Sequence, residues 1–333
     1  MRICQVAVSA VLVVVGSLGA AVADTVELKI AAAAPEGSPW AQVLGLYEAR
    51  VEKASKGRID VTIEHRATGT EPEIVAQTSR GGLQGMLASG GAVGTVVAEL
   101  ETLELPFLFR SAAEADRVLD GPLMAPMEKR FREHGLVLGF WNENGFRHIG
   151  STFPIHKPAD LSGKTIRSVE TPVHVEMWRT LKVDAEMTAA DRVVSKLQSS
   201  ELDGFDQTLL FAVASEWHTA VKHVTLTSHI YQPAVVAFNQ AWFDGLPKDL
   251  QNIVLGEGRR LSREGRAIVR RLEPGLLKTL KKAGVKVTRL SGGERTAFES
   301  ATAPVRASFR KNYSPTAIEM LDKIEKALGR KIR

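Results

Sequence analysis

The stretch "VELKIAAAAPEGSPWAQVLGLYEARVEKASKGRIDVTIEH", residues 26–65, decides the fold class. Residues 26–34 have the pattern of a strand that ends in small residues. A helix is predicted over 39–55, because apolar residues recur there every three or four positions and Gly57 closes the segment. The recurring residues are Leu44, Tyr47 and Val51. Residues 58–65 alternate apolar and polar side chains, which indicates a second strand.

The alternation of strands and helices continues beyond this stretch. A helix is predicted near 71–80, and a strand, helix, strand, helix order favours an α/β fold with mainly parallel pairing. Residues 136–145 predict a strand, and a separate strand-like segment follows at 146–152. Residues 223–247 suggest a strand, a crossover and another strand.

The last third of the chain is predicted to be mostly helical. A long helix is expected over 247–273, where apolar residues recur at nearly heptad spacing and Pro274 ends or kinks the helix. A late strand is expected over 285–290. Two further helices are expected near 293–312 and 316–328, and no internal repeat is visible.

Length and composition describe an ordinary globular protein. The chain has 333 residues, which suggests roughly two domains. Charged residues make up 24% and hydrophobic residues 44%, enough apolar material for a sizeable core.

The first residues have the pattern of a cleaved secretory signal peptide. Arg2 is followed by the uncharged run 6–23, which ends in Ala21-Val22-Ala23 before Asp24. The alternative is an uncleaved membrane anchor, although small residues dilute the second half of the run. Cleavage after residue 23 would change the formal charge from +5 to +4.

Cysteine use agrees with export to the periplasm. Cys4 precedes the apolar run, so the mature chain would contain no cysteine, disulfide or cysteine-based metal site. An exported protein of this size without disulfides must be held together by its core, as in the periplasm of a Gram-negative bacterium.

The usual motifs of catalysis and metal binding do not appear. The Gly-rich segment 81–94 lacks both a phosphate-loop lysine and a dinucleotide-binding pattern, so a close-packed strand and turn is the better interpretation. His218, His223 and His229 do not have the spacing of a zinc motif. The Asp-Gly pair at 203–204 is best explained as a turn, and no nucleophile motif or carboxylate pair is apparent.

One helix face carries an arginine stripe. The stripe consists of Arg259, Arg263, Arg266 and Arg270. A nucleic-acid binder could use such a stripe, but glutamates are interleaved with it, and a solvated face is the favoured interpretation.

Two arginines on or beside predicted strands raise a different question. Arg147 and Arg167 stand twenty residues apart. Arginine is always charged, and its planar fork matches a carboxylate through two parallel hydrogen bonds. They are either ordinary surface charges or groups directed at an anion.

Seven segments, in order along the mature chain, resemble a known family. They are "APEGSPW", "KASKGRIDVTI", "LELPFLF", "GFRHIGS", "PADLSGKTIRS", "LDGFDQT" and "LTSHIYQP". Each is weak alone, but together the sequence resembles the DctP-like solute-binding proteins of tripartite ATP-independent periplasmic (TRAP) transporters.

The resemblance implies a two-domain fold. Two α/β domains of the periplasmic binding protein type (class II) would surround a ligand cleft, joined by crossing strands and a long helix. The first domain would comprise 24–144 and about 232–272. The second would comprise 145–231 and about 273–333.

The resemblance also implies a ligand site. Arg167 matches the arginine of the "GKxxR" strand that grips a ligand carboxylate, and Arg147 matches the "GFR" arginine that often gives a second contact. Gln207 stands where the family often has asparagine, and Ala190 where an aromatic residue often lines the pocket. The aromatic wall could then come from Trp40 or Phe205. Contacts from the first domain are expected at Ser38, Trp40, Glu71 and Ser89.

The implied function is capture rather than catalysis. The resemblance suggests a periplasmic receptor that binds an organic-acid anion and passes it to the small and large subunits of a TRAP permease. No enzyme activity, cofactor, metal or nucleic-acid partner is expected, and the chain is expected to be a monomer. The alternatives are a receptor for another polar solute, or a sensor partner or enzyme on the same scaffold.

Overall fold

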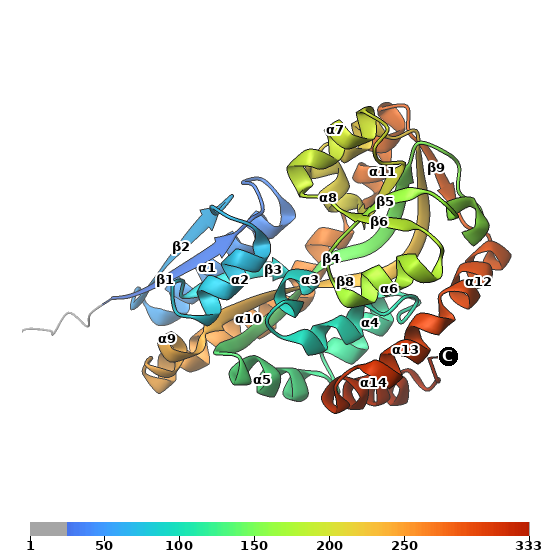
Figure 1. The fold of residues 1–333 in the computed structure, drawn as a ribbon. Helices are drawn as coiled ribbons and strands as arrows, with labels where there is room; N and C mark the ends of the chain where they lie inside the picture. The colour runs from blue at the N-terminus through green and yellow to red at the C-terminus, as the bar shows by residue number, and fades with distance from the viewer. Residues whose placement is uncertain (1–24, 333) are drawn as a thin grey trace, which may run out of the picture.

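The computed structural model describes residues 25–332, so the predicted signal peptide lies outside the described residues. Nine strands form one sheet in the order β2-β1-β3-β8-β4-β7-β5-β6, with β9 paired to β8 (Figure 1). The strands are β1 (Val26–Ala32), β2 (Ile59–His65), β3 (Gly85–Ser89), β4 (Leu136–Ser151), β5 (Thr165–Ser168), β6 (Asp184–Met187), β7 (Gly204–Thr208), β8 (His223–Asn239) and β9 (Lys286–Arg289).

Helices cover this sheet, and the predicted α/β fold is confirmed. The α-helices are α1 (Pro39–Ser55), α2 (Glu71–Ser79), α3 (Gly90–Gly94), α4 (Ala112–Leu119), α5 (Met124–Glu133), α6 (Pro172–Thr180), α7 (Val193–Gln198), α8 (Leu209–Ala214), α9 (Gln240–Asp244), α10 (Lys248–Arg270), α11 (Glu273–Lys282), α12 (Gly292–Ala301), α13 (Ala303–Asn312) and α14 (Pro315–Leu328). Short 3₁₀ segments are η1 (Ala98–Glu104), η2 (Pro158–Leu161), η3 (Ala190–Arg192) and η4 (Trp217–Ala220).

Several predicted elements are found where the sequence placed them. The helix over 39–55 has the expected bounds, and the long helix α10 ends at Arg270, shortly before Pro274 in the first turn of α11. Parallel pairs occur at both ends of the sheet, where β1 joins β2 and β3, and β5 joins β6 and β7. The pairs of β8 with β3 and of β4 with β7 and β8 are antiparallel.

The strands β4 and β8 are single long strands, so the predicted crossover within 223–247 is wrong, and 136–151 is not divided. They pair along almost their whole length, with register shifts between Leu138 and Phe140, between Glu143 and Gly145, and between Arg147 and Ile149. Such bulges let a strand bend and twist without ending. The ladder to β3 ends at Ala234, so Pro233, which has no N–H to donate, is paired only with Glu143 of β4.

The two long strands change neighbours midway. β8 pairs with β3 through residues 234–238, whereas β4 pairs with β7 through residues 147–151. One half of the sheet therefore contains β1 to β3, and the other contains β5 to β7 (Figure 1). The proposed domain boundaries near 145 and 232 lie where the long strands change neighbours, and they stay a prediction. The terminal helix α14 packs against α4 and η1.

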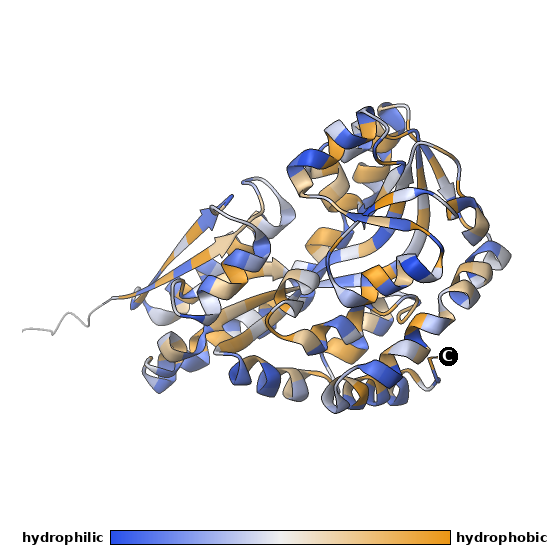
Figure 2. Cartoon of the chain, viewed as in Figure 1, coloured by the Kyte–Doolittle hydropathy of each residue, from blue (hydrophilic) through white to orange (hydrophobic). Residues whose placement is uncertain are grey.

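Apolar side chains form three core clusters. One packs α1 and α10 on the first half of the sheet, and another joins α7, α8, α11 and β9 in the second half. The largest runs from η1 and α4 through β4 and β8 to α6 and α14. Figure 2 shows hydrophobic colour concentrated along the strands, while the outer helices alternate hydrophilic and hydrophobic residues. No helix within residues 25–332 has both the length and the apolar character that a bilayer crossing requires.

The arginine stripe on α10 is not a solvated face at its C-terminal end, which corrects the interpretation from sequence. The side chain of Arg266 is fully buried, and its guanidinium lies 2.8 Å from Asp116 and 2.5 Å from Asp120. Arg270 pairs with Asp116 at 2.7 Å and with Glu143 at 2.5 Å. Asp116 and Asp120, in and just after α4, and Glu143 of β4 cover this end of the stripe, so these arginines tie α10 to its neighbours.

Close packing between β4 and β7 gives a first prediction. A Cβ atom at Gly150 would lie 2.4 Å from Cζ of Phe205, a ring that is itself buried. Gly150→Ala is therefore expected to lower the free energy of unfolding by about 1–3 kcal/mol through overpacking, measured by urea denaturation. Gly256→Ala on α10 is the control, because its Cβ would meet no atom within 4 Å. An equal effect of both variants would contradict the tight contact.

Candidate functional site

Arg147 lies at the centre of the sheet, opposite Thr208 of β7 and Ile230 of β8. Its side chain is fully buried. Nε donates to Oδ2 of Asp206 at 2.7 Å, and Nη2 donates to the backbone oxygen of the same residue at 2.7 Å. The charge of Arg147 is therefore matched within the protein by a neighbouring carboxylate.

The third nitrogen of Arg147 reaches two glutamines. Nη1 donates to Oε1 of Gln207 at 3.1 Å and to Oε1 of Gln232 at 3.2 Å. Oε1 of Gln207 also accepts a bond from the amide of Thr208 at 2.8 Å. The structure thus brings the predicted site residues Arg147 and Gln207 into direct contact, with every guanidinium nitrogen of Arg147 bonded.

Further buried polar groups extend these contacts toward η1 and α6. Gln232 accepts from Asn144 at 2.8 Å and donates to Glu104 at 3.4 Å, and Glu104 lies 2.7 Å from Nε2 of His174. We call this set the crossing network, because it lies where β4 and β8 pass between the two halves of the sheet. Its members are Glu104, Asn144, Arg147, His174, Asp206, Gln207, Thr208, His229 and Gln232.

Asp206 is the acidic centre of the crossing network. Its Oδ2 lies 3.4 Å from Nε2 of His229 and 3.7 Å from Nδ1 of His174, in addition to its bond from Arg147. Burial raises the pKa of Asp206, but the charge of Arg147 and hydrogen bonds from His229 and Arg147 outweigh burial and hold the pKa well below its ordinary value. Burial in turn lowers the pKa of His229.

Arg167 has different surroundings from Arg147. It lies on β5, and its Nε donates to the backbone oxygen of Thr188 at 3.0 Å. Its guanidinium carbon lies 4.9 Å from the centre of the Trp217 ring. Nη1 is buried and has no hydrogen-bond partner among the described residues. Burial and the charge of Arg147 lower the pKa of Arg167 to about 10, so it stays charged at neutral pH.

Aromatic residues lie behind Arg167. The indole nitrogen of Trp217 donates to the backbone oxygen of Ala190 at 3.1 Å. The rings of Phe205 and Phe211 meet Trp217 edge-on at 5.2 Å and 5.3 Å between centroids. Phe205 is buried in this cluster, whereas Ala190 is exposed and contributes its carbonyl group.

Two of the residues expected from the first domain are in contact with each other. The hydroxyl of Ser89 donates to Glu71 at 2.6 Å, and its backbone amide donates to the same carboxylate at 3.2 Å. Burial raises the pKa of Glu71, and the two bonds from Ser89 oppose that rise. A Cβ at Gly90, next to Ser89, would meet Glu104, so this pair borders the crossing network.

Ser38 and Trp40 have structural partners at the start of α1. The Ser38 hydroxyl caps the helix by accepting from the amide of Ala41 at 3.2 Å. The indole of Trp40 is buried in the core of the first half and donates to the backbone oxygen of Glu143 at 2.9 Å. Within residues 25–332, no hydrogen bond or ion pair joins either side chain to Arg147 or Arg167.

Sequence reasoning missed the acid and the aromatic residue that hold the two arginines. Asp206 immediately precedes the predicted Gln207, and a charged residue inside the buried strand β7 was the available signal. The sequence did not indicate the contact of Trp217 with Arg167, because the two residues lie fifty positions apart and come together only in the folded protein.

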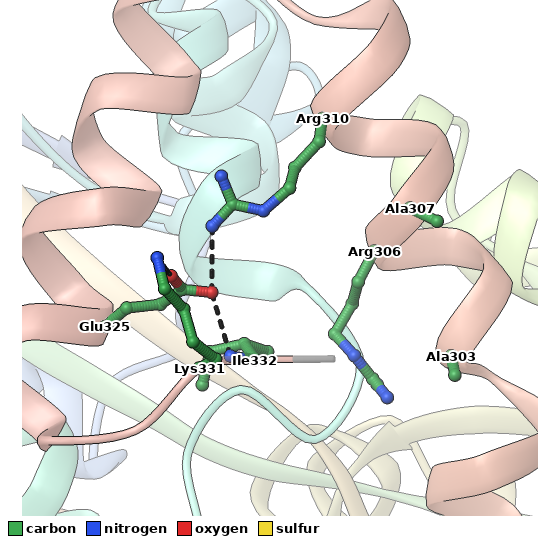
Figure 3. Close-up of a pocket in the computed structure, with 7 residues that line it drawn as sticks. All are labelled: Ala303, Arg306, Ala307, Arg310, Glu325, Lys331 and Ile332. Carbon is green, nitrogen blue, oxygen red and sulfur yellow. Dashed lines mark hydrogen bonds and ion pairs between the residues drawn. The ribbon is translucent and has the colours of Figure 1, made fainter.

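Concave spaces of the described chain also occur away from Arg147 and Arg167. The larger has a volume of about 280 Å³ and lies between α13 and the end of the chain (Figure 3). Its glutamate, Glu325, already pairs with Arg310 at 2.8 Å and Lys331 at 3.0 Å. A smaller one, about 170 Å³, lies between α6 and α13. Within residues 25–332, no group of three or more metal-ligating side chains is arranged to hold a metal ion.

Comparisons with known proteins agree on one family. Residues 30–312 match the family "Bacterial extracellular solute-binding protein, family 7", known as DctP. A solute-binding protein of Verminephrobacter eiseniae is 32% identical over 304 residues, which cover 91% of this chain and 90% of the relative.

Solved structures share the whole fold. A TRAP periplasmic solute-binding protein from Ochrobactrum anthropi, with its C-terminus bound in the ligand pocket, is 26% identical with a TM-score of 0.84, covering 92% of this chain and 96% of that chain. The sugar-acid-binding protein of Advenella mimigardefordensis, in complex with galactonate, is 25% identical with a TM-score of 0.84, covering 91% and 99%. The resemblance read from the sequence motifs is confirmed, and the chain belongs to the DctP family of bacterial extracellular solute-binding proteins.

Proposed function

We propose that this chain is a periplasmic receptor that captures a small organic-acid anion through Arg167 and delivers it to a TRAP permease. The observation that carries the proposal is the difference between the two arginines. Arg147 is matched by the buried carboxylate of Asp206, whereas Arg167 donates to a neutral carbonyl and stacks on an indole.

The unmatched charge of Arg167 favours an anionic ligand. No ion pair links Arg167 to an acid among the described residues, and its buried Nη1 has no hydrogen-bond partner. A partly buried guanidinium without an acidic partner is costly, and a ligand carboxylate would supply both the charge and two parallel acceptors. The Advenella relative binds galactonate, an acid of this kind.

The remaining predicted residues would act around that contact. Arg147 would orient Gln207 rather than bind the carboxylate itself, because its nitrogens are already bonded. Glu71 and Ser89 would meet polar groups at the other end of the solute, and Phe205 would act behind Trp217. For Ser38 and Trp40, a direct ligand contact stays a prediction that requires movement at the start of α1.

Capture would couple to closure of the two halves of the sheet. A solute that contacts both halves only when they approach each other shifts the equilibrium toward the closed form. Exclusion of water then strengthens the contact with Arg167. The receptor would work as a monomer without cofactor or catalytic step, and the membrane subunits would recognise its closed form.

The test of this proposal is Arg167→Ala, assayed by thermal shift and calorimetry with galactonate, glucuronate, pantoate and succinate. At least one acid should raise the melting temperature of the parent protein. The variant should bind that acid about 30- to 1000-fold more weakly, because a charge-assisted paired contact contributes on the order of 2–4 kcal/mol. Arg179→Ala is the control, since its side chain is 74% exposed and pairs only within α6. Unchanged affinity in Arg167→Ala would refute the role of Arg167.

A further prediction concerns the charge balance at the crossing network. Asp206→Asn should lower the free energy of unfolding by about 3 kcal/mol at pH 7, because Arg147 would stay buried without its counter-charge. The pKa of Asp206 is lowered in the folded protein, so its contribution is complete above the ordinary aspartate pKa of about 3.9 and is lost as pH falls further.

Urea unfolding of the parent and of Asp206→Asn from pH 7 to pH 3 measures this effect. The stability difference should stay constant down to about pH 4 and shrink below it. The control is Asp184→Asn, because Asp184 is exposed on the edge strand β6. A difference that does not depend on pH would show that the Asp206 charge is not what stabilises the pair.

A further inference from the structure

The backbone carbonyls of Thr188 and Ala190, in the segment that follows β6, hold Arg167 and Trp217 against each other. The oxygen of Thr188 accepts from Nε of Arg167 at 3.0 Å, and the oxygen of Ala190 accepts from Nε1 of Trp217 at 3.1 Å. Between these two bonds, the guanidinium lies over the indole at 4.9 Å. One short loop therefore fixes both members of a cation–π pair.

The loop and the indole are themselves fixed. The Thr188 hydroxyl donates to Glu186 at 2.9 Å, and Lys196 of α7 pairs with the same carboxylate. Trp217 is fully buried, with Phe205 and Phe211 against its edges. The indole is thus a rigid surface under Arg167.

This arrangement leaves one part of the guanidinium for a ligand. Nε is bonded and one face is covered, so the two Nη groups are the donors that stay available for a carboxylate fork. A free arginine side chain loses rotamer entropy when it is fixed, and prior fixing reduces that loss on binding.

We propose that Trp217 is a positioning residue that holds Arg167 with its Nη edge ready for a carboxylate. The effect on affinity rests on the proposed function of Arg167, whereas the effect on Arg167 mobility does not. This role also accounts for Ala190: its side chain supplies no aromatic wall, but its carbonyl anchors the tryptophan that does the positioning.

The first experiment observes Arg167 directly, without any ligand. The Nε–Hε signal of Arg167 is assigned by its loss in Arg167→Lys, and its ¹⁵N heteronuclear Overhauser effect is measured. The signal should be rigid in the parent protein and in Trp217→Phe, which keeps an aromatic face. It should become mobile in Trp217→Leu. A signal that stays rigid in Trp217→Leu overturns the proposal.

Controls separate positioning from general loss of packing. Trp141→Leu also removes a fully buried indole, from the largest core cluster, and should leave the Arg167 signal rigid. A mobile Arg167 in Trp141→Leu would overturn the assignment to Trp217. Circular dichroism checks folding first; if Trp217→Leu does not fold, Trp217→Met replaces it as a flexible side chain without a π face, with the same expected mobility.

The second experiment measures affinity for whichever of galactonate, glucuronate, pantoate and succinate binds the parent protein best. Trp217→Leu should weaken binding by about tenfold, and Trp217→Phe by about twofold or less. In Arg167→Ala, the additional change Trp217→Leu should have no further effect, because Trp217 acts through Arg167.

The outcomes distinguish the two proposals. Loss of affinity in Arg167→Ala with full affinity in Trp217→Leu keeps the proposed function and overturns the positioning role. Full affinity in Arg167→Ala refutes the proposed binding role, while the mobility measurement still decides whether Trp217 fixes the arginine. An equal weakening by Trp217→Leu in the presence and absence of Arg167 also overturns the positioning role.

Discussion

The buried ion pair between Arg147 and Asp206 organises the centre of this molecule. Two full charges with no exposed surface can coexist there because each is the other's partner. The remaining nitrogen of Arg147 reaches Gln207 and Gln232, and Oδ2 of Asp206 also lies 3.4 Å from His229. The pair joins β4 to β7 by side chains in addition to the backbone ladder. It also separates the roles of the two arginines, since one is satisfied internally and the other is not.

Much of the fold followed from local pattern. The helix over 39–55, the alternating strand after it and the helix break shortly before Pro274 could be predicted, because periodicity, Gly57 and proline act within one turn of the chain. The continuity of β8 was not readable, because Pro233 normally marks an interruption. Pro233 lies just beyond the end of the ladder to β3, which is a tertiary fact.

The ligand site stays a prediction. The resemblance proposed Arg147, Gln207, Glu71 and Ser89 as separate ligand contacts, and the structure shows hydrogen bonds from Arg147 to Gln207 and from Ser89 to Glu71. Motifs could not show which acid neutralises Arg147 or which ring lies under Arg167, because both contacts arise between strands and segments distant in sequence. The buried part of the α10 stripe was misread for the same reason, because the acids that cover it lie in and just after α4 and on β4, far away in the sequence.

The unbroken course of β4 and β8 has a mechanical consequence. A pair of antiparallel strands resists stretching along its length, while its twist changes readily at bulges. Three register shifts lie along this pair, on both sides of the point where the strands change neighbours. Rotation of one half of the sheet against the other would therefore twist this two-stranded ribbon, and the link from α10 to α11 would have to move with it.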